Sequence, residues 1–311
     1  MAETMVTALR ENTPADVPPG RSVWSEAFHS LRRRPSVVIA MLVAVLFVIV
    51  AAFPRLFTSA DPGRCDIGRA KIKPQWFGGE HPFGTDLFGC DYYAQTIYGA
   101  RPSLVLAFVV VGCSVLIGLT LGSLAGYYLG AVDAVISRLL EVFLVVPFLL
   151  AALLVLSMFR GVDLGNSQFM ALLPPAIVLA MFGWISYTRY VRASTLETKN
   201  FQFVLAAKAL GASDRRIIFR HILPNSIAPV TALIPTSIGG IIATEAVLSF
   251  LGIGVRPPAI SWGIMIANGA EWARGGYPHL LLFPLGCLVA TILAFVVLGD
   301  ALRDALDPKL R

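Results

Sequence analysis

The chain has 311 residues and a formal net charge of +6; 56% of the residues are hydrophobic and 14% are charged. An ordinary soluble domain carries about a quarter charged residues. Together with a mean hydropathy of +0.73, this composition argues against a soluble globular domain and indicates an integral membrane protein. Anionic lipid and membrane topology account for the positive charge without a nucleic-acid partner.

The N-terminal segment is polar, and we expect it to lie outside the membrane core. Residues 1–21 are predicted to form a disordered cytoplasmic tail without a cleavable signal peptide. Residues 22–36 place Trp24, Phe28 and Leu31 on one helical face, followed by three arginines. We interpret this segment as an amphipathic helix on the cytoplasmic leaflet. A helix packed against protein is the alternative.

From residue 37 to 311 the sequence predicts one all-α transmembrane domain. Six apolar segments are each close to the ~20 residues that cross a bilayer core. They are Val37–Pro54, Leu104–Leu129, Val135–Phe159, Ala171–Val191, Ile227–Phe250 and Leu280–Leu298.

Lysine and arginine indicate the orientation of these spans. With the N-terminus in the cytoplasm, the cytoplasmic segments hold sixteen of the 25 basic residues and the outside segments nine. This bias predicts that both termini are cytoplasmic. Most of the outside basic residues lie in or beside a large loop expected at residues 58–103.

Cys65 and Cys90 both lie in this outside loop, where an oxidising compartment permits a disulfide. A bridge would close a loop of 25 residues, and the chain-entropy model gives such a loop roughly 3 kcal/mol. The alternative is two free or metal-binding thiols, although no CxxC pair or histidine spacing indicates a metal. Cys113 and Cys287 fall within spans, where we interpret them as packing residues.

The spans carry two further signals. Gly118, Gly122 and Gly126 recur every fourth residue in the second span, a pattern that lets helix backbones approach closely. We interpret it as packing within the chain, with contact to a partner subunit as the alternative. Glu141, three residues after Arg138, is expected to form a structural ion pair.

A charged segment lies within the cytoplasmic loop expected at residues 192–226. A run of small residues meets Gly211, and a second short helix begins at once, with Ser213 as its N-cap and Asp214 in its first turn. We expect Pro224 to stop this second helix. The element is a compact helix–Gly–helix unit that a partner can grip. It holds Ala206, Ala207, Ala209, Arg215, Arg216, Arg220, His221 and Asn225.

Glu245 lies deep in the fifth span. An ionisable residue at this depth is a functional candidate by default. It either lines a solute pathway or forms a buried hydrogen bond that holds the helix. The prolines and glycines of this span, Pro229, Pro235, Gly239 and Gly240, predict a kinked or irregular helix.

Motifs of catalysis are absent from the sequence. It has no GxxxxGK[ST] phosphate loop, no HExxH and no GxSxG, and its four histidines are scattered. We therefore expect no metal or cofactor site on this chain, and no ATP hydrolysis by the chain alone.

The helix–Gly–helix segment resembles the cytoplasmic loop signature of ABC importer permeases, EAA–xxx–G followed ten residues later by a histidine and LPN. Ala206, Ala207, Gly211, His221 and the run Leu223–Asn225 match it, whereas Leu205 replaces the usual glutamate. Three further segments resemble the second, C-type permease of dipeptide and oligopeptide importers, although Cys90 stands where arginine is usual. They are HPFGTDLFGCDYYAQTIYGARPSL (His81–Leu104), EAVLSFLGIGVRPPAISWGIMI (Glu245–Ile266) and LGDALRDALDPKLR (Leu298–Arg311).

The resemblance implies a type I importer permease fold of six transmembrane helices in the bacterial inner membrane. It implies a non-catalytic subunit that forms the translocation path with a related permease. Two partner ATPase subunits would bind ATP and Mg, grip the coupling helix and switch the path, and an outside binding protein would deliver the solute. The resemblance covers carriers of dipeptides, longer peptides, nickel chelates and glutathione alike.

Two other classes compete with this interpretation. A gradient-driven transporter or channel would explain the spans and Glu245, but not a self-contained cytoplasmic helix–Gly–helix element. A structural membrane anchor would explain that element without a path between the spans.

Overall fold

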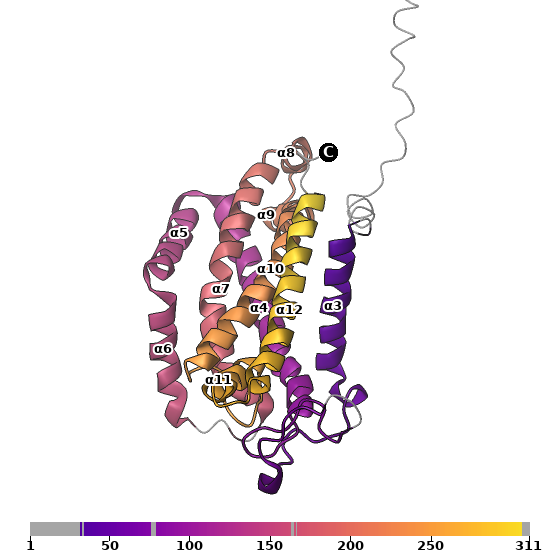
Figure 1. The fold of residues 1–311 in the computed structure, drawn as a ribbon. Helices are drawn as coiled ribbons and strands as arrows, with labels where there is room; N and C mark the ends of the chain where they lie inside the picture. The colour runs from indigo at the N-terminus through magenta and orange to yellow at the C-terminus, as the bar shows by residue number, and fades with distance from the viewer. Residues whose placement is uncertain (1–31, 33, 76–78, 163–164, 166, 307–311) are drawn as a thin grey trace, which may run out of the picture.

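The computed structural model describes residues 32, 34–75, 79–162, 165 and 167–306. The expected tail at 1–21 and most of the expected amphipathic helix at 22–36 lie outside these residues. The described chain is a bundle of long helices (Figure 1). The helices are α3 (Pro35–Ala52), α4 (Tyr92–Tyr128), α5 (Gly130–Val145), α6 (Phe148–Met158), α7 (Gln168–Thr198), α8 (Gln202–Ala209), α9 (Asp214–Ile217), α10 (Leu223–Phe250), α11 (Trp262–Ala273) and α12 (His279–Leu306).

Within the described residues, five helices are long and apolar enough to cross a membrane: α3, α4, α7, α10 from Val230 onward, and α12. The sixth predicted span is present as a bent pair, α5 and α6, whose axes differ by 85°. The apolar segment expected at Val135–Phe159 thus corresponds to this pair, which is bent and not one straight helix. Pro147 disfavours helical geometry in the residue before it, and Val146 is extended with φ −75° and ψ 120°.

The two ends of the bundle differ in content. The start of α3 and the end of α12 lie at the same end as α8 and α9, which we call the hairpin end (Figure 1). There, Arg34 on the N-terminal flank of α3 forms a 2.8 Å ion pair with Asp304 of α12. The opposite end carries the segment with Cys65 and Cys90 together with α11, and we call it the disulfide end.

Helix α4 begins twelve residues before the predicted span. Asp91 caps it by accepting a 2.7 Å hydrogen bond from the backbone N–H of Ala94, which satisfies one of the free donors at a helix start. The loop expected at residues 58–103 therefore ends at Asp91. The sequence pattern does not indicate these extra turns, because residues 92–103 are too polar for a membrane-spanning segment.

Helices α4 and α7 pack closely against each other. A Cβ atom at Gly122 would lie 2.6 Å from the carbonyl oxygen of Thr188, and one at Gly126 would lie 2.7 Å from the Cβ of Thr195. Gly118 faces the same helix at Tyr187. The glycine series thus lies against a helix of the same chain, with no space left for a side chain.

Replacing Gly122 with alanine is expected to lower the stability of the purified protein by about 1–3 kcal/mol, because the added methyl group forces α4 away from α7. Thermal unfolding in detergent measures the effect. The matched control is Gly112→Ala in the same helix, where a Cβ meets nothing within 4 Å. Equal melting temperatures for the two variants would contradict this packing.

Candidate functional site

The helix–Gly–helix element forms a closed hairpin at one end of the bundle. Helix α8 ends at Ala209, and Gly211 adopts φ +79°. The N–H of Gly211 donates to the carbonyl of Lys208 (3.0 Å), and the N–H of Ala212 donates to that of Ala207 (3.1 Å). This pair of bonds is a Schellman motif, in which a left-handed residue lets the chain reverse while the last carbonyls stay paired.

A small apolar core holds the hairpin together. Val204 of α8 and Ile217 of α9 are buried with Ile222, and Tyr127 at the end of α4 packs against them. The hydroxyl of Tyr127 also donates a 2.6 Å hydrogen bond to Asp214 Oδ1. The hairpin is therefore fixed to the bundle by both apolar contact and a charge-assisted hydrogen bond.

The remaining predicted residues of the hairpin divide by exposure. Ser213 occupies the N-cap position of α9 without a side-chain capping bond. Ala207 and His221 are half-buried. The residues that are exposed are Ala206, Ala209, Gly211, Ser213, Asp214, Arg215, Arg216, Arg220, Pro224 and Asn225.

Large apolar side chains are exposed beside these residues. Leu205, which occupies the position of the usual glutamate, is 53% exposed, and Leu210 is 88% exposed. Phe219 is exposed next to Arg215 and Arg216, and the three line a shallow depression with Ser213. Exposed apolar groups among arginines are typical of a protein-binding surface.

Pro224 does not end the second helix, contrary to expectation. Helix α9 passes through a π-helical turn at Ile218–Ile222 directly into α10. Pro224 lies in the first turn of α10, where its missing N–H is tolerated. The side chain of Asn225 donates to the carbonyl of His221 (2.6 Å). The irregularity expected within the fifth span lies at this turn, and α10 continues as one helix past Pro235 and Gly239.

Glu245, near the far end of α10, has no exposed surface. Its Oε1 accepts hydrogen bonds from the hydroxyls of Ser249 (2.7 Å) and Ser261 (2.8 Å), and Oε2 accepts a 3.4 Å bond from Ser103. Ser103 belongs to α4, and Ser261 caps α11 through the N–H of Ile264. The carboxylate thus joins three elements. Of the two alternatives considered for Glu245, this geometry favours the buried hydrogen bond that holds the helix.

Cys65 and Cys90 form a disulfide at the opposite end of the bundle. Asp86 supports it, because its Oδ1 accepts the N–H groups of Phe88 (2.9 Å) and Cys90 (2.8 Å). Its Oδ2 accepts a 2.9 Å bond from Gln95 of α4.

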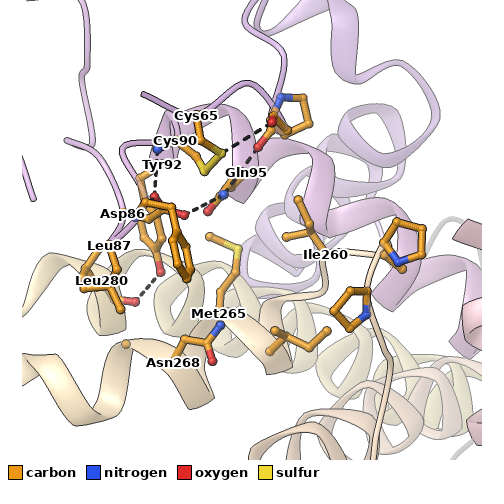
Figure 2. Close-up of a pocket in the computed structure, with 18 residues that line it drawn as sticks. Cys65, Asp86, Leu87, Cys90, Tyr92, Gln95, Ile260, Met265, Asn268 and Leu280 are labelled. Carbon is orange, nitrogen blue, oxygen red and sulfur yellow. Dashed lines mark hydrogen bonds between the residues drawn. A yellow bond between two sulfur atoms is a disulfide. The ribbon is translucent and has the colours of Figure 1, made fainter. Parts of the chain in front are cut away.

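The disulfide forms part of the wall of an apolar cavity of about 270 Å³. Figure 2 shows the cavity between the disulfide segment, the start of α4, and α11, with Met265 and Asn268 at its lower side. Lys71 lies with its Nζ 4.0 Å from the centre of the Trp272 ring, which attaches the disulfide segment to α11 by a cation–π contact.

Labelling with a maleimide in denaturant is expected to modify only Cys113 and Cys287 when no reductant is present, because the other two sulfurs are bonded to each other. Reduction should add two labels, and intact mass spectrometry counts them. Four labels without reductant would contradict the disulfide.

Replacing Glu245 with leucine is expected to destabilise the protein by about 1–3 kcal/mol or more, since buried serine hydroxyls lose their acceptor. Glu245→Gln should cost less because it keeps an acceptor oxygen. Thermal unfolding is the measurement. Thr244→Ala is the control, because Thr244 is only half-buried and its hydroxyl donates to the carbonyl of Gly240 within α10. An unchanged melting temperature for Glu245→Leu would exclude the three-element link.

Comparison with known proteins places the chain among membrane transport components. Residues 118–311 match the family model described as binding-protein-dependent transport system inner membrane component. The dipeptide transport system permease protein DppC of Alkalihalophilus pseudofirmus is 36% identical over 96% of this chain and 94% of that protein. The oligopeptide transport system permease protein OppC of Bacillus subtilis is 35% identical over 93% and 91%.

A solved structure shares the fold. An inward-facing conformation of the MetNI methionine ABC transporter superposes with a TM-score of 0.54 at 18% identity, covering 68% of this chain and 96% of that one. The exposed hairpin, the bundle of apolar helices and the family match all indicate the same family. The chain belongs to the family of inner membrane components of binding-protein-dependent transport systems, and is a multi-pass protein of the bacterial inner membrane.

Proposed function

We propose that this chain is one of two related permeases of an ATP-driven peptide importer, and that its α8–α9 hairpin docks on a partner ATPase. The observation that carries the proposal is the continuous helix from Asp214 to Phe250. A force applied at the hairpin passes along this helix to Glu245, because no loop intervenes to absorb it. The substrate class rests on the printed functions of the relatives, dipeptide and oligopeptide transport.

In this scheme the hairpin end is cytoplasmic, with both termini. The disulfide end faces the oxidising side, where disulfides persist, and receives solute from a binding protein. ATP and Mg are bound by the two ATPase subunits and not by this chain. The ATPase-docking residues are Ala206, Ala207, Gly211, Ser213, Asp214, Arg215, Arg216, His221, Pro224 and Asn225.

The exposed chemistry of the hairpin specifies the kind of groove it enters. Leu205 and Leu210 need an apolar surface to cover them, and Arg215 and Arg216 favour acidic partners around it. A gradient-driven transporter would need an ionisable residue that the solute or ion can reach. Glu245, the main candidate for that role, is buried and hydrogen-bonded to serines.

The experiment is to purify the chain with its partner permease, ATPases and binding protein, reconstitute the complex, and measure peptide-stimulated ATP hydrolysis and peptide uptake. Gly211→Val is expected to leave the helices inserted and to abolish stimulated hydrolysis and uptake. A left-handed conformation costs a residue other than glycine about 1–2 kcal/mol, and a β-branched one more, so the hairpin loses its shape.

The matched control is Gly211→Asn, because asparagine tolerates the left-handed conformation. It should retain most of the stimulated activity, and a Cβ at this position meets no neighbour. Normal peptide uptake by Gly211→Val would count against the coupling role. A complex that assembles without any ATPase partner would overturn the proposed function itself.

A further inference from the structure

One face of α7 changes character along its length. Leu172, Pro175 and Leu179 lie on this face at helical spacing, and Ser186, Arg189, Tyr190 and Ala193 continue it after Phe182. The first three residues are buried, whereas the last four are exposed. We call this face the α7 stripe.

An apolar cluster covers the stripe toward the disulfide end. Leu172 and Leu179 pack there with Leu156 of α6, Leu248 of α10 and Ile253. Toward the hairpin end this cover stops, and Ser186, Arg189, Tyr190 and Ala193 line a hollow of about 440 Å³. The stripe is thus closed on one side of the membrane and open on the other.

Most of the large apolar side chains that α7 exposes lie away from this face. Three of them, Leu173, Ile177 and Met181, lie on the opposite side of the helix, as their spacing from Ser186 requires, whereas Tyr190 is exposed on the stripe itself. Near the hairpin end that opposite side is covered by α4, against which Thr188 and Val191 pack. The polar stripe is therefore the free surface of α7 at this depth.

Arg189 carries an uncompensated charge in the hollow. Arg192, in the following turn, forms two hydrogen bonds with Asp133 (2.5 and 2.6 Å), whereas Arg189 has no ion-pair partner among the described residues. No acidic residue lies within one turn of it on α7. A charge exposed along a membrane-spanning helix is costly, and marks a functional pathway by default.

We propose that the α7 stripe is a half-channel open to the cytoplasm, in which Arg189 receives the terminal carboxylate of the solute during its release. The inference rests on the proposed function and deepens it. A guanidinium binds a carboxylate through two parallel hydrogen bonds, and Ser186 and Tyr190 offer hydroxyls beside it. Every linear peptide with a free C-terminus carries this group, and a C-terminal amide lacks it.

The first test needs no transport. Ala193→Cys introduces a thiol into the hollow, and inside-out vesicles of the whole complex are treated with a sulfonate-bearing or a trimethylammonium-bearing methanethiosulfonate. The wild-type chain gives the background from Cys113 and Cys287. We expect the anionic reagent to react faster than the cationic one with this thiol. Adding Arg189→Gln should lower the ratio of the anionic to the cationic reaction rate about tenfold. Arg138→Gln, which breaks the exposed pair with Glu141, should leave the ratio unchanged.

The second test compares uptake of one tripeptide as free acid and as C-terminal amide by the reconstituted complex. Arg189→Gln is expected to lower uptake of the acid about tenfold and to leave that of the amide unaltered, with Arg189→Lys intermediate. The same binding protein serves every variant, so its own preference cancels in the comparison.

Three outcomes would overturn the inference. The first is a thiol at position 193 that neither reagent reaches from the cytoplasmic side, and the second is an acid-to-amide uptake ratio unaffected by Arg189→Gln. The third is that Arg189→Gln changes only the dependence of uptake on anionic lipid. The last would make Arg189 a lipid contact. If the wild-type complex imports neither peptide while the reagent ratio still responds to Arg189, the proposed function fails and the anion-receiving half-channel stands.

Discussion

The buried carboxylate of Glu245 is the interaction on which the arrangement of the helices depends. It lies at the far end of α10 from the hairpin and is shared by hydroxyls from α4, α10 and the start of α11. A charged or polar group at this depth is tolerated only with its partners in place. Separating the three elements would leave buried polar groups without partners. The helix that leaves the hairpin therefore ends in a fixed joint.

Other contacts of the bundle join the same helices to one another and to α7. At the hairpin end, Tyr127 attaches α4 to Asp214 of α9, and nearer the disulfide end Ser103 attaches α4 to Glu245 of α10. Between the joints α4 lies against α7 through Gly118, Gly122 and Gly126. Helices packed at such close approach shift as a unit, because no flexible side chain lies between them. Displacement of the hairpin would thus move α4, α7 and α10 as one body.

The sequence predicts the features that depend on local pattern. It does not predict the features that depend on contacts between residues far apart in the chain. Span number, the helix–Gly–helix element and the apolar composition of the spans all follow from periodicity and residue type. Pro224 was misjudged, because its effect depends on the π-helical turn before it. Local pattern leaves two alternatives for Glu245, since its partner Ser103 lies 142 residues away in the sequence. The Tyr127–Asp214 bond is equally non-local, and no spacing indicates it. The polar start of α4 has the pattern of a loop in the sequence, because a capped helix outside the membrane needs no apolar pattern.

The arginines at the disulfide end show how side-chain chemistry can obscure a topological signal. Arg101 donates to the carbonyls of Ala51 and Ala52 at the end of α3, both at 2.9 Å. Arg256 donates to the carbonyls of Phe159 (2.8 Å) and Leu156 (3.3 Å) at the end of α6. Helix C-termini carry unpaired carbonyls and partial negative charge, so a cation there stabilises them. These two basic residues are structural caps of helices that end at this face. Because helix capping accounts for these two arginines, they are weaker evidence for the orientation of the spans than a count of all basic residues assumes.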